Sequence, residues 1–588
     1  MFYTPHDTIV SIAQQRAQQH PDQNYITFLE DGDDLEKQLS YRELDHSAVH
    51  VASWLTWQGL EKADRVLLIL PNSVEFVQVF YGCLYGGFLA VPLSEPSSPK
   101  QMQAYLDNFI PTFRTCEPKV IVTTSLLAEI IKTQMPPDLQ NLFSDITITT
   151  PEEILAGVAA AVKLPMIGVS ETAFLQFTSG STGRPKGIKL SHSNIMNNLE
   201  QARMFGNWEE GKGTALWLPL FHDFGLAAGL MGSMYNGGFV ALMTPAQFIM
   251  QPMRWLKAVT KYRCAYSYAP PFAFDMCLKR ITPEGKKELD LSSLIAVVDG
   301  SEPVHYEGVK GFNDYFADCG LSPTAIRPGF GMAETVIMFS ESKGLESLCV
   351  DRHLLEAEGQ LSLVEESTPD ADKKYLVNLG THMVDHEIAV MGENNKALPE
   401  GKVGDIMISG PSVCEGYYRN PTATEETFRQ RIGGKDKFFL ATGDLGLMWK
   451  EHLYFTGRRK DVIIIRGKNI YPQDIEYAVA VVKEIRPGCV IAFSSQSNSG
   501  EALVLAMEVR ADLLKDLDTF HKEILNTLDM NVTRLVGQKF KVFPEERLYL
   551  MPGTISKTSS GKIKHAANAK KFGQAEFEGL LARRAPQK

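Results

Sequence analysis

"VLLILPNSVEFVQVFYGCLYGGFLAVPL", residues 66–93, predicts two buried strands joined by a helix. VLLIL (66–70) and FLAVPL (88–93) are apolar throughout, and the helix between them is expected from residue 73 to about residue 84. Strands of this kind, separated by helices, are typical of a parallel sheet that is covered on both faces. The sequence therefore predicts an α/β fold.

The same alternation continues on both sides of this unit. A helix is expected around Tyr41–Trp57, and KVIVTT (119–124) predicts a further strand followed by a short helix. A chain of 588 residues is too long for one hydrophobic core, so at least two domains are expected. We predict a large, multi-lobed N-terminal domain over residues 1–457, built on parallel βαβ sheets.

The pattern changes after ATGDLG (441–446). The remaining chain predicts a small, mobile α+β domain over residues 458–588, joined to the large domain through the short charged segment 457–461. Its expected elements are two short strands within 452–476, a helix that begins near Pro472, strands at 489–495 and 502–509, and a helix from about residue 514 to residue 528.

Charge and composition narrow the classes of function. The formal charge of −11 argues against nucleic acid as a partner, because phosphate-backbone binding needs a basic surface. No apolar run is long enough to cross a bilayer, and the first residues lack a signal-peptide pattern, so a cytoplasmic protein is expected. The eight cysteines have no metal-ligand spacing. Residues 551–588 carry eight Lys or Arg and two acids, which fits a solvated tail or a docking surface.

The loop TSGSTGRPKG (178–187) is the first candidate for a site. Strand-like segments precede it at 172–177 and follow it at 187–192. Glycines let successive backbone N–H groups converge, and the hydroxyls add donors, so the loop can bind the phosphates of a nucleotide. A Walker A loop is excluded because Lys186 precedes Gly187 and is followed by neither Ser nor Thr. The alternative is a featureless loop.

Seven further stretches could form one site together with this loop, if several loops of the chain meet there. All of these motifs together resemble those of the adenylate-forming superfamily, which contains acyl-CoA synthetases, luciferases and peptide-synthetase adenylation domains. Within it the chain is most similar to the fatty acyl-AMP ligases. This resemblance implies that ATP and a fatty acid give an acyl-adenylate and pyrophosphate. The stretches that support it are WLPLFHDFGL (217–226), GSEPV (300–304), RPGFGMAETV (327–336), ATGDLG (441–446), YFTGRRKD (454–461), GKNIYPQDIE (467–476) and TSSGKIK (558–564).

The resemblance implies three roles close to the reacting groups. Lys562 matches the catalytic lysine that reaches from the small domain toward the carboxylate and the α-phosphate, two anions that repel by ~4 kcal/mol at 4 Å and an effective dielectric of about 20. Glu334 matches the acid that holds Mg²⁺, an ion that requires oxygen ligands. His222 lies in the motif beside the acyl carboxylate, where it could donate a hydrogen bond to the carboxylate or act as a gate. The alternative is that Lys562 and Glu334 are ordinary surface residues and that His222 is a hydrogen-bonded structural histidine.

The resemblance also implies a set of nucleotide contacts, for which the alternative is structural pairing or core packing. Asp444 matches the acceptor of both ribose hydroxyls. Phe330 replaces a tyrosine that is commonly stacked on adenine, and a phenyl face can still stack. Ala333 replaces a threonine, so residue 333 offers no hydroxyl to the α-phosphate. The expected nucleotide-binding residues are Thr178, Ser179, Gly180, Ser181, Thr182, Gly183, Lys186, Gly300, Ser301, Glu302, Phe330, Gly331, Met332, Ala333, Asp444, Phe455 and Arg458.

Two features bear on the acyl acceptor. Lys460 matches the hinge about which acyl-CoA synthetases rotate their small domain. The segment around 344–375 resembles the insertion that packs against the small domain of fatty acyl-AMP ligases and disfavours coenzyme A chemistry. We therefore expect the acceptor to be the phosphopantetheine of an acyl carrier protein, or of a carrier domain in a polyketide or lipopeptide synthase.

Several alternatives stay open at this point. The chain could be an acyl-CoA synthetase, an amino-acid adenylation enzyme in which Asp223 binds the amino group, or a non-catalytic nucleotide-binding module. The stretch 226–243, rich in Gly, Ala and Met, could line an acyl pocket or form a close-packed helix followed by a strand.

Overall fold

The predicted strand–helix–strand unit forms the centre of a six-stranded sheet. In this computed structural model β3 (Arg65–Ile69) and β4 (Leu89–Leu93) pair in parallel, and α3 (Val74–Gly86) connects them. The Ser73 side chain caps α3, and Gly87 ends it with φ +70°, in the left-handed region that favours glycine. The prediction of an α/β fold is confirmed. The strand order is β6-β5-β3-β4-β7-β8, with β5 Val120–Thr123, β6 Thr147–Thr149, β7 Thr172–Thr178 and β8 Lys186–Ser191.

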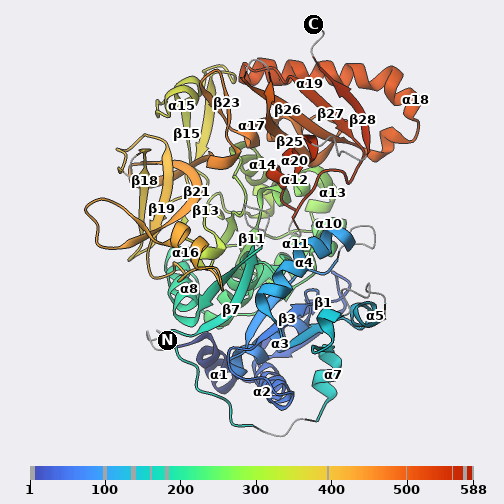
Figure 1. The fold of residues 1–588 in the computed structure, drawn as a ribbon, viewed down its shortest axis with the longest axis vertical. Helices are drawn as coiled ribbons and strands as arrows, with labels where there is room; N and C mark the ends of the chain where they lie inside the picture. Colours follow the sequence, from blue (N-terminus) through green and yellow to red (C-terminus); the bar gives the residue numbers. More distant parts are fainter. Residues whose placement is uncertain are drawn as a thin grey trace.

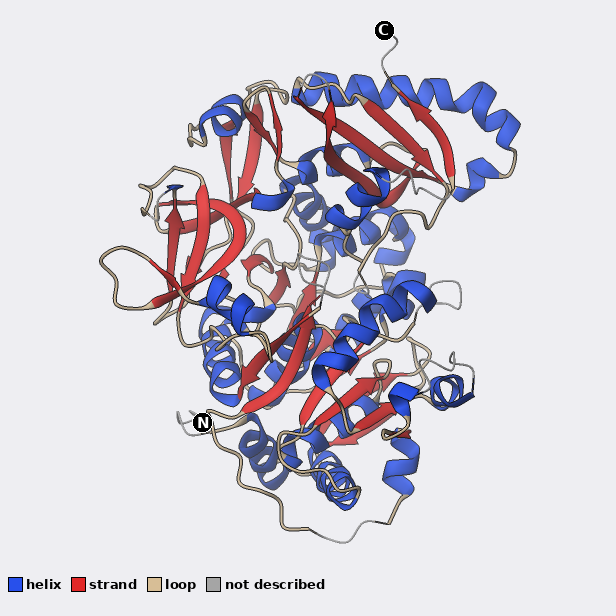
Figure 2. Cartoon of the chain, in the orientation of Figure 1, coloured by secondary structure: helices blue, strands red, loops and turns tan. Residues whose placement is uncertain are grey.

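The structure describes residues 7–96, 102–133, 141–158, 162–178, 185–393, 396–497, 500–558, 561–573 and 579–585. In Figure 1 the N-terminal elements, in blue, lie at one end of the molecule, and the C-terminal elements, in red, lie at the other. Figure 2 shows that helices flank the sheets of the N-terminal half. Among the described residues, no helix has the length and apolar character that a membrane crossing requires.

A nine-stranded sheet brings two predicted site loops to one edge. Its central strands run in parallel in the order β1-β10-β9-β11-β12-β13. Parallel strands end at the same edge, so the loops after β12 and β13 lie side by side. A Cβ atom added to Gly300 would lie 3.3 Å from the Gly329 carbonyl oxygen. The strands are β1 Asn24–Leu29, β2 Glu36–Ser40, β9 Thr214–Leu216, β10 Val240–Leu242, β11 Tyr266–Ala269, β12 Ala296–Asp299, β13 Ile326–Phe330, β14 Ser340–Glu341 and β17 Thr381–His382.

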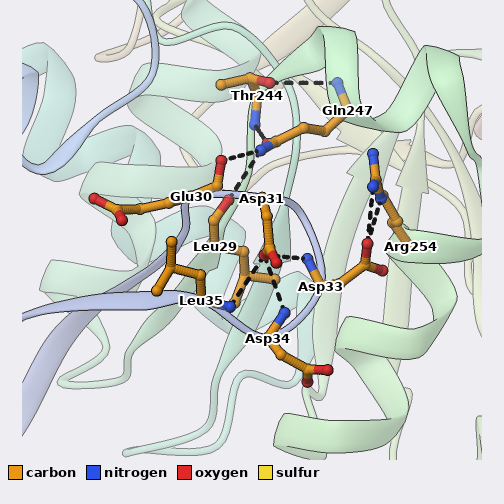
Figure 3. Close-up of polar contacts among 9 residues, drawn as sticks. All are labelled: Leu29, Glu30, Asp31, Asp33, Asp34, Leu35, Thr244, Gln247 and Arg254. Carbon is orange, nitrogen blue, oxygen red and sulfur yellow. Dashed lines mark hydrogen bonds and ion pairs between the residues drawn. The ribbon is translucent and has the colours of Figure 1, made fainter.

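The β1–β2 hairpin is fastened to two helices of this sheet (Figure 3). The Asp31 carboxylate accepts hydrogen bonds from the backbone N–H groups of Asp33, Asp34 and Leu35. Arg254 donates two hydrogen bonds to the Asp33 carboxylate, at 3.0 and 2.8 Å, and Gln247 donates to two backbone carbonyls at the end of β1. These contacts hold the loop between β1 and β2 in place against the two helices. Gln247 lies on α10 (Pro245–Met250) and Arg254 on α11 (Met253–Tyr262).

Helices cover both of these sheets. Helix α2 spans Tyr41–Trp57, as expected, and a capping box between Ser40 and Glu43 fixes its start. The other covering helices are α1 Ile9–Gln19, α4 Met102–Cys116, α5 Ser125–Thr133, α7 Pro151–Ala156, α8 His192–Gly206, α12 Pro271–Arg280, α13 Pro283–Lys286 and α14 Tyr306–Phe316.

The stretch 226–243 forms a buried helix followed by a strand. A π-helix spans Phe224–Met231 and continues into α9 (Gly232–Tyr235), and every residue of both is buried. A Cβ atom at Gly229 would lie 2.6 Å from the Leu216 side chain, so only glycine permits this helix to approach the strand so closely. The stretch therefore has the helix-and-strand form that one of the two alternatives expected.

A five-stranded sheet ends at the predicted domain boundary. Strand β22 (His452–Arg458) pairs with β21 (Phe438–Trp449) and contains residue 457, and a short 3-10 turn, η7 (Arg459–Asp461), follows it. The expected boundary between residues 457 and 458 thus falls inside a strand, one residue before its end. The remaining elements here are β18 Glu387–Met391, β19 Gly404–Ser409, α16 Pro421–Phe428 and β20 Gln430–Arg431.

The last part of the chain, residues 463–584, has hydrophobic cores of its own, on both faces of a four-stranded sheet; we call it the C-terminal unit. The expected helix continues beyond residue 528 and ends at Phe540, and two strands appear that the sequence analysis did not predict, β27 (Glu546–Leu550) and β28 (Leu580–Arg584). The other elements are β23 Ile463–Ile465, β24 Lys468–Ile470, α17 Pro472–Val479, β25 Ile485–Ser497, β26 Gly500–Val509, α18 Leu517–Thr519, α19 Leu525–Phe540 and α20 His565–Gly573.

The segment around 344–375 packs against the C-terminal unit. It contains β15 (Ser347–Asp351) and α15 (Arg352–Glu358) and leads into β16 (Lys373–Val377), and Figure 1 shows α15 and β15 beside β23. The Arg352 guanidinium lies 5.0 Å from the centre of the Phe540 ring, and Lys374 Nζ lies 2.6 Å from an Asp474 carboxylate oxygen. These two contacts therefore connect the 344–375 segment to the C-terminal unit.

Candidate active site

The glycine-rich loop joins two antiparallel strands. Thr178 ends β7 and Lys186 begins β8, directly opposite each other. Lys186 Nζ lies 4.7 Å from the centre of the Tyr417 ring. The loop residues Ser179, Gly180, Ser181, Thr182 and Gly183 lie outside the described residues. The two ends of the loop are thus held by a strand pair, with a cation at one of them.

Glu334 lies on a 3-10 turn, η5 (Ala333–Thr335), after β13. The Tyr417 hydroxyl donates a 2.9 Å hydrogen bond to its carboxylate, and its backbone carbonyl accepts from the N–H of Cys414. Burial raises the pKa of the Glu334 carboxyl, although the Tyr417 hydroxyl and Lys186 act in the opposite direction. A cation bound here would be stabilised by this carboxylate and would relieve the cost of burying it.

The backbone around this acid is tight. Val336 has φ +72° and ψ −64°, which is a strained γ-turn conformation for a β-branched residue. A Cβ atom at Gly331 would lie 1.7 Å from the Ile337 carbonyl oxygen. Phe330 is only 7% exposed and belongs to the hydrophobic core, and Met332 packs against that core. The loop that contains Glu334 is therefore defined by close backbone contact.

The loop after β12 faces the C-terminal unit. Ser301 has φ +76°, in the left-handed region, between Gly300 and Glu302. Burial raises the pKa of the Glu302 carboxyl, and the nearby ammonium groups of Lys562 and Lys557 oppose this. This carboxylate is therefore an electrostatic partner for residues of the C-terminal unit.

His222 and Asp223 form a close pair before the π-helix. His222 Nδ1 lies 2.5 Å from Asp223 Oδ1, and Asp223 also accepts a 2.7 Å hydrogen bond from the backbone N–H of Phe224. Burial alone would raise the pKa of Asp223, but His222 and Lys562 lower it on balance. Asp223 is thus a carboxylate that contacts His222 and lies in the field of Lys562.

Asp444 and Arg458 lie opposite each other on β21 and β22. Arg458 Nε lies 3.3 Å from Asp444 Oδ1; Asp444 is largely buried, whereas the Arg458 side chain is half exposed. Burial raises the pKa of the Asp444 carboxyl, and Arg458 opposes this. Phe455 lies three residues earlier on β22 and packs against the core. The pair offers a carboxylate and a guanidinium to one ligand.

Lys562 brings these groups together across the chain. Burial lowers the pKa of its ammonium group, while three carboxylates from the larger part of the chain oppose this, and Arg458 adds to the lowering. Lys460, on η7, lies in the field of Asp444 and Lys186, and burial lowers its pKa. A cation from the C-terminal unit is thus placed at the meeting point of several separate loops. The three carboxylates are those of Glu302, Asp223 and Asp444.

The comparisons with known proteins agree with this arrangement. Residues 13–418 match the family of AMP-binding enzymes. The chain belongs to this family. This AMP-binding enzyme is 31% identical over 580 residues to the medium-chain-fatty-acid–[acyl-carrier-protein] ligase JamA of Moorena producens, covering 98% of this chain and 96% of the relative. It is 31% identical to the long-chain-fatty-acid–AMP ligase FadD26 of Mycobacterium marinum, over 97% of this chain and 98% of the relative.

A solved structure from a study of fatty acyl-adenylate ligases of E. coli and L. pneumophila superposes on this AMP-binding enzyme with a TM-score of 0.87. The two chains are 30% identical, and the match covers 97% of this chain and 98% of the other. The agreement extends over the N-terminal sheets and the C-terminal unit alike.

Sequence reasoning missed Tyr417 and Val336. Tyr417 lies in the unremarkable run GYYRN (416–420), and its contact with Glu334 spans more than 80 residues of sequence. Val336 is strained only because of the backbone path around it. Neither residue type nor spacing marks these positions.

Proposed function

We propose that this AMP-binding enzyme activates a medium- or long-chain fatty acid with ATP, forming an acyl-adenylate and releasing pyrophosphate. The acyl group then passes to the phosphopantetheine of a carrier protein. The names of the two relatives support the substrate class and the carrier, and the full-length match supports the same reaction in this chain.

The placement of Lys562 is the observation on which this proposal depends. A fatty carboxylate and an α-phosphate that approach within about 4 Å repel by ~4 kcal/mol at an effective dielectric of about 20, which corresponds to roughly three decades of rate. An ammonium group between them offsets this repulsion. The carboxylates around Lys562 favour its charged form in the absence of substrate.

The nucleotide is proposed to lie across the loops that meet here. The 178–187 loop binds the phosphates, Lys186 adds a cation, and the Asp444 carboxylate accepts the ribose hydroxyls while Arg458 contacts ribose or phosphate. The adjacent loops 300–302 and 330–333 line the adenine. His222 donates to the fatty carboxylate, an orientation supported by its close pairing with Asp223.

Magnesium fits this site only together with the nucleotide. Among the described residues there is no group of three or more His, Cys, Asp or Glu side chains that could hold a metal ion. Mg²⁺ is commonly bound by one or two carboxylates together with phosphates and waters. Glu334 supplies one partly buried carboxylate in the field of Lys186, so Glu334 would hold the ion, which would supply charge neutralisation at the phosphates.

The contact between the 344–375 segment and the C-terminal unit supports the preference for a carrier protein over coenzyme A. This contact would keep Lys562 close to the loops that precede the C-terminal unit in the chain. Three of the basic residues near the C-terminus already have partners: Arg583 pairs with Glu546, Arg584 donates to Asn526, and Lys571 donates to Ser556. Lys570 is exposed, so it is the better residue for testing an acidic carrier's docking.

Product analysis tests the proposed function. Fatty acids from C6 to C18 are incubated with the enzyme, ATP and Mg²⁺, with and without coenzyme A, and with a phosphopantetheinylated carrier. We expect pyrophosphate and acyl-AMP without an acceptor, and acyl transfer to the carrier. If acyl-CoA is the main product, the chain is an acyl-CoA synthetase. If pyrophosphate exchange depends on amino acids, it is an amino-acid adenylation enzyme. If no carboxylic acid gives pyrophosphate, it is a non-catalytic nucleotide-binding module.

A further inference from the structure

A second pair of titratable side chains begins three residues after Lys562 in the chain. His565, the first residue of α20, places Nε2 2.7 Å from Oε1 of Glu476 on α17. The same Glu476 oxygen accepts a 2.9 Å hydrogen bond from the backbone N–H of Ala492 on β25. Both side chains of the pair are largely buried, at 24% and 14% exposed. Glu476 is therefore fixed to the sheet of the C-terminal unit, and it fixes His565 in turn.

Lys562 lies on a short hairpin that ends just before His565. Residues 557 and 563 form an isolated bridge, the Thr558 N–H donates to the Lys562 carbonyl at 2.7 Å, and the Lys562 N–H donates to Thr558 Oγ1 at 3.0 Å. These contacts join the two described sides of the hairpin. Its orientation on the C-terminal unit depends on what fastens its two ends.

One end of the hairpin is fastened by Asn568, which is fully buried. Its side chain accepts from the Ser556 N–H at 2.8 Å and donates to the Ser556 carbonyl at 2.9 Å. The other end of the hairpin runs into α20. There, the contact of His565 with Glu476 joins the start of the helix to α17. The pair is thus the second fastening point, three residues from Lys562.

We propose that His565, held by Glu476, is a positioning residue that aims the Lys562 ammonium at the reacting carboxylate and α-phosphate. Because this role presupposes the proposed adenylate formation, its loss lowers turnover only through Lys562. Misplacement of a reacting group by about 1 Å can cost up to a hundredfold in rate, so we expect a drop of about tenfold to a hundredfold in kcat when the pair is broken.

The charges around His565 make this positioning dependent on pH. Burial and the nearby Arg458 lower the pKa of the imidazole, whereas Glu476 and Asp461 raise it. The raising effects are larger, so the pKa lies above the ordinary histidine value of 6.5. The ion pair is complete below that raised pKa and is lost as pH rises through it. Turnover should therefore fall on the alkaline side with the titration of His565, in addition to any fall from Lys562 itself.

The test measures kcat for pyrophosphate release and the KM for ATP between pH 6 and 10. His565→Gln and Glu476→Gln should lower kcat about tenfold or more and leave KM for ATP within threefold. His565→Arg keeps a permanent cation, so it should retain most of the activity and lack the part of the alkaline fall that the titration of His565 causes. His521→Gln, on an exposed histidine of the same unit, is the matched control and should behave like the wild type.

A double variant separates positioning from general damage. If His565 acts through Lys562, adding His565→Gln to Lys562→Ala should cause no further loss. A further tenfold loss, an unchanged kcat in His565→Gln, or an alkaline fall that persists unchanged in His565→Arg would each overturn the proposal. Failure of the wild type to release pyrophosphate from any fatty acid would instead refute the proposed function, and the two failures are therefore distinguishable.

Discussion

Lys374 Nζ lies 2.6 Å from the Asp474 carboxylate, which joins β16 to α17 of the C-terminal unit. Only 9% of the Lys374 side chain and 16% of the Asp474 side chain are exposed, and Lys374 also lies 4.4 Å from the centre of the Tyr471 ring. Removing one member of a buried pair is costly because the other charge stays buried. This contact therefore holds the C-terminal unit against β16.

Lys374→Met should loosen this contact. We expect acyl-CoA formation from a fatty acid, ATP and coenzyme A to rise severalfold, because the C-terminal unit gains freedom to rotate, while pyrophosphate release without coenzyme A stays within threefold. The control is Lys373→Met, since the adjacent lysine pairs with the exposed Asp370 at 3.4 Å. Equal acyl-CoA yields from both variants and the wild type would contradict the proposed restraint.

Tyr417→Phe tests the environment of Glu334. Burial raises the pKa of Glu334, and the Tyr417 hydroxyl opposes this, so removing the hydroxyl should raise the pKa further. Because the ionised carboxylate is the form that binds a cation, turnover falls as pH drops through this pKa, and the acid limb of the pH profile should move to higher pH. Tyr418→Phe is the control; an acid limb that does not move in Tyr417→Phe would show that the hydrogen bond has no such effect.

The sequence predicted the elements whose pattern is local. The unit at 66–93 and helix α2 could be predicted because continuous apolar strands and a capped amphipathic helix depend on neighbouring residues. Strand β28 could not, because LLARR has no alternating pattern and becomes a strand through pairing with β27. Pairing of β22 through Arg458 could not be predicted either, so the sequence did not show that the proposed boundary at residue 457 lies within a strand.

The motifs predicted candidate site residues but not the contacts between them. The motifs pointed to Lys562, Asp444 and Glu334, but the close pair of His222 with Asp223 and the hydrogen bond from Tyr417 arise from folding. The strain at Val336 has the same origin, because a valine in sequence gives no sign of a positive φ.

The close backbone path around Glu334 gives a stability prediction. Gly331→Ala would place a Cβ atom 1.7 Å from the Ile337 carbonyl oxygen, so the backbone must shift. Overpacking of this kind typically costs about 1–3 kcal/mol, and thermal denaturation should show a melting temperature that is several degrees lower. Gly433→Ala is the control, because nothing lies within 4 Å of its added Cβ atom. Equal melting temperatures for the two variants would mean that the backbone around Gly331 can shift without loss of stability.

The central claim is that the Lys562 ammonium offsets the repulsion between the fatty carboxylate and ATP. Its most direct test is the exchange of labelled pyrophosphate into ATP that depends on a fatty acid, measured for the wild type, Lys562→Ala and the exposed control Lys570→Ala. The claim predicts that exchange falls at least a hundredfold in Lys562→Ala, about 2.7 kcal/mol of transition-state stabilisation, and is unchanged in Lys570→Ala. Exchange by Lys562→Ala within threefold of the wild type would contradict it.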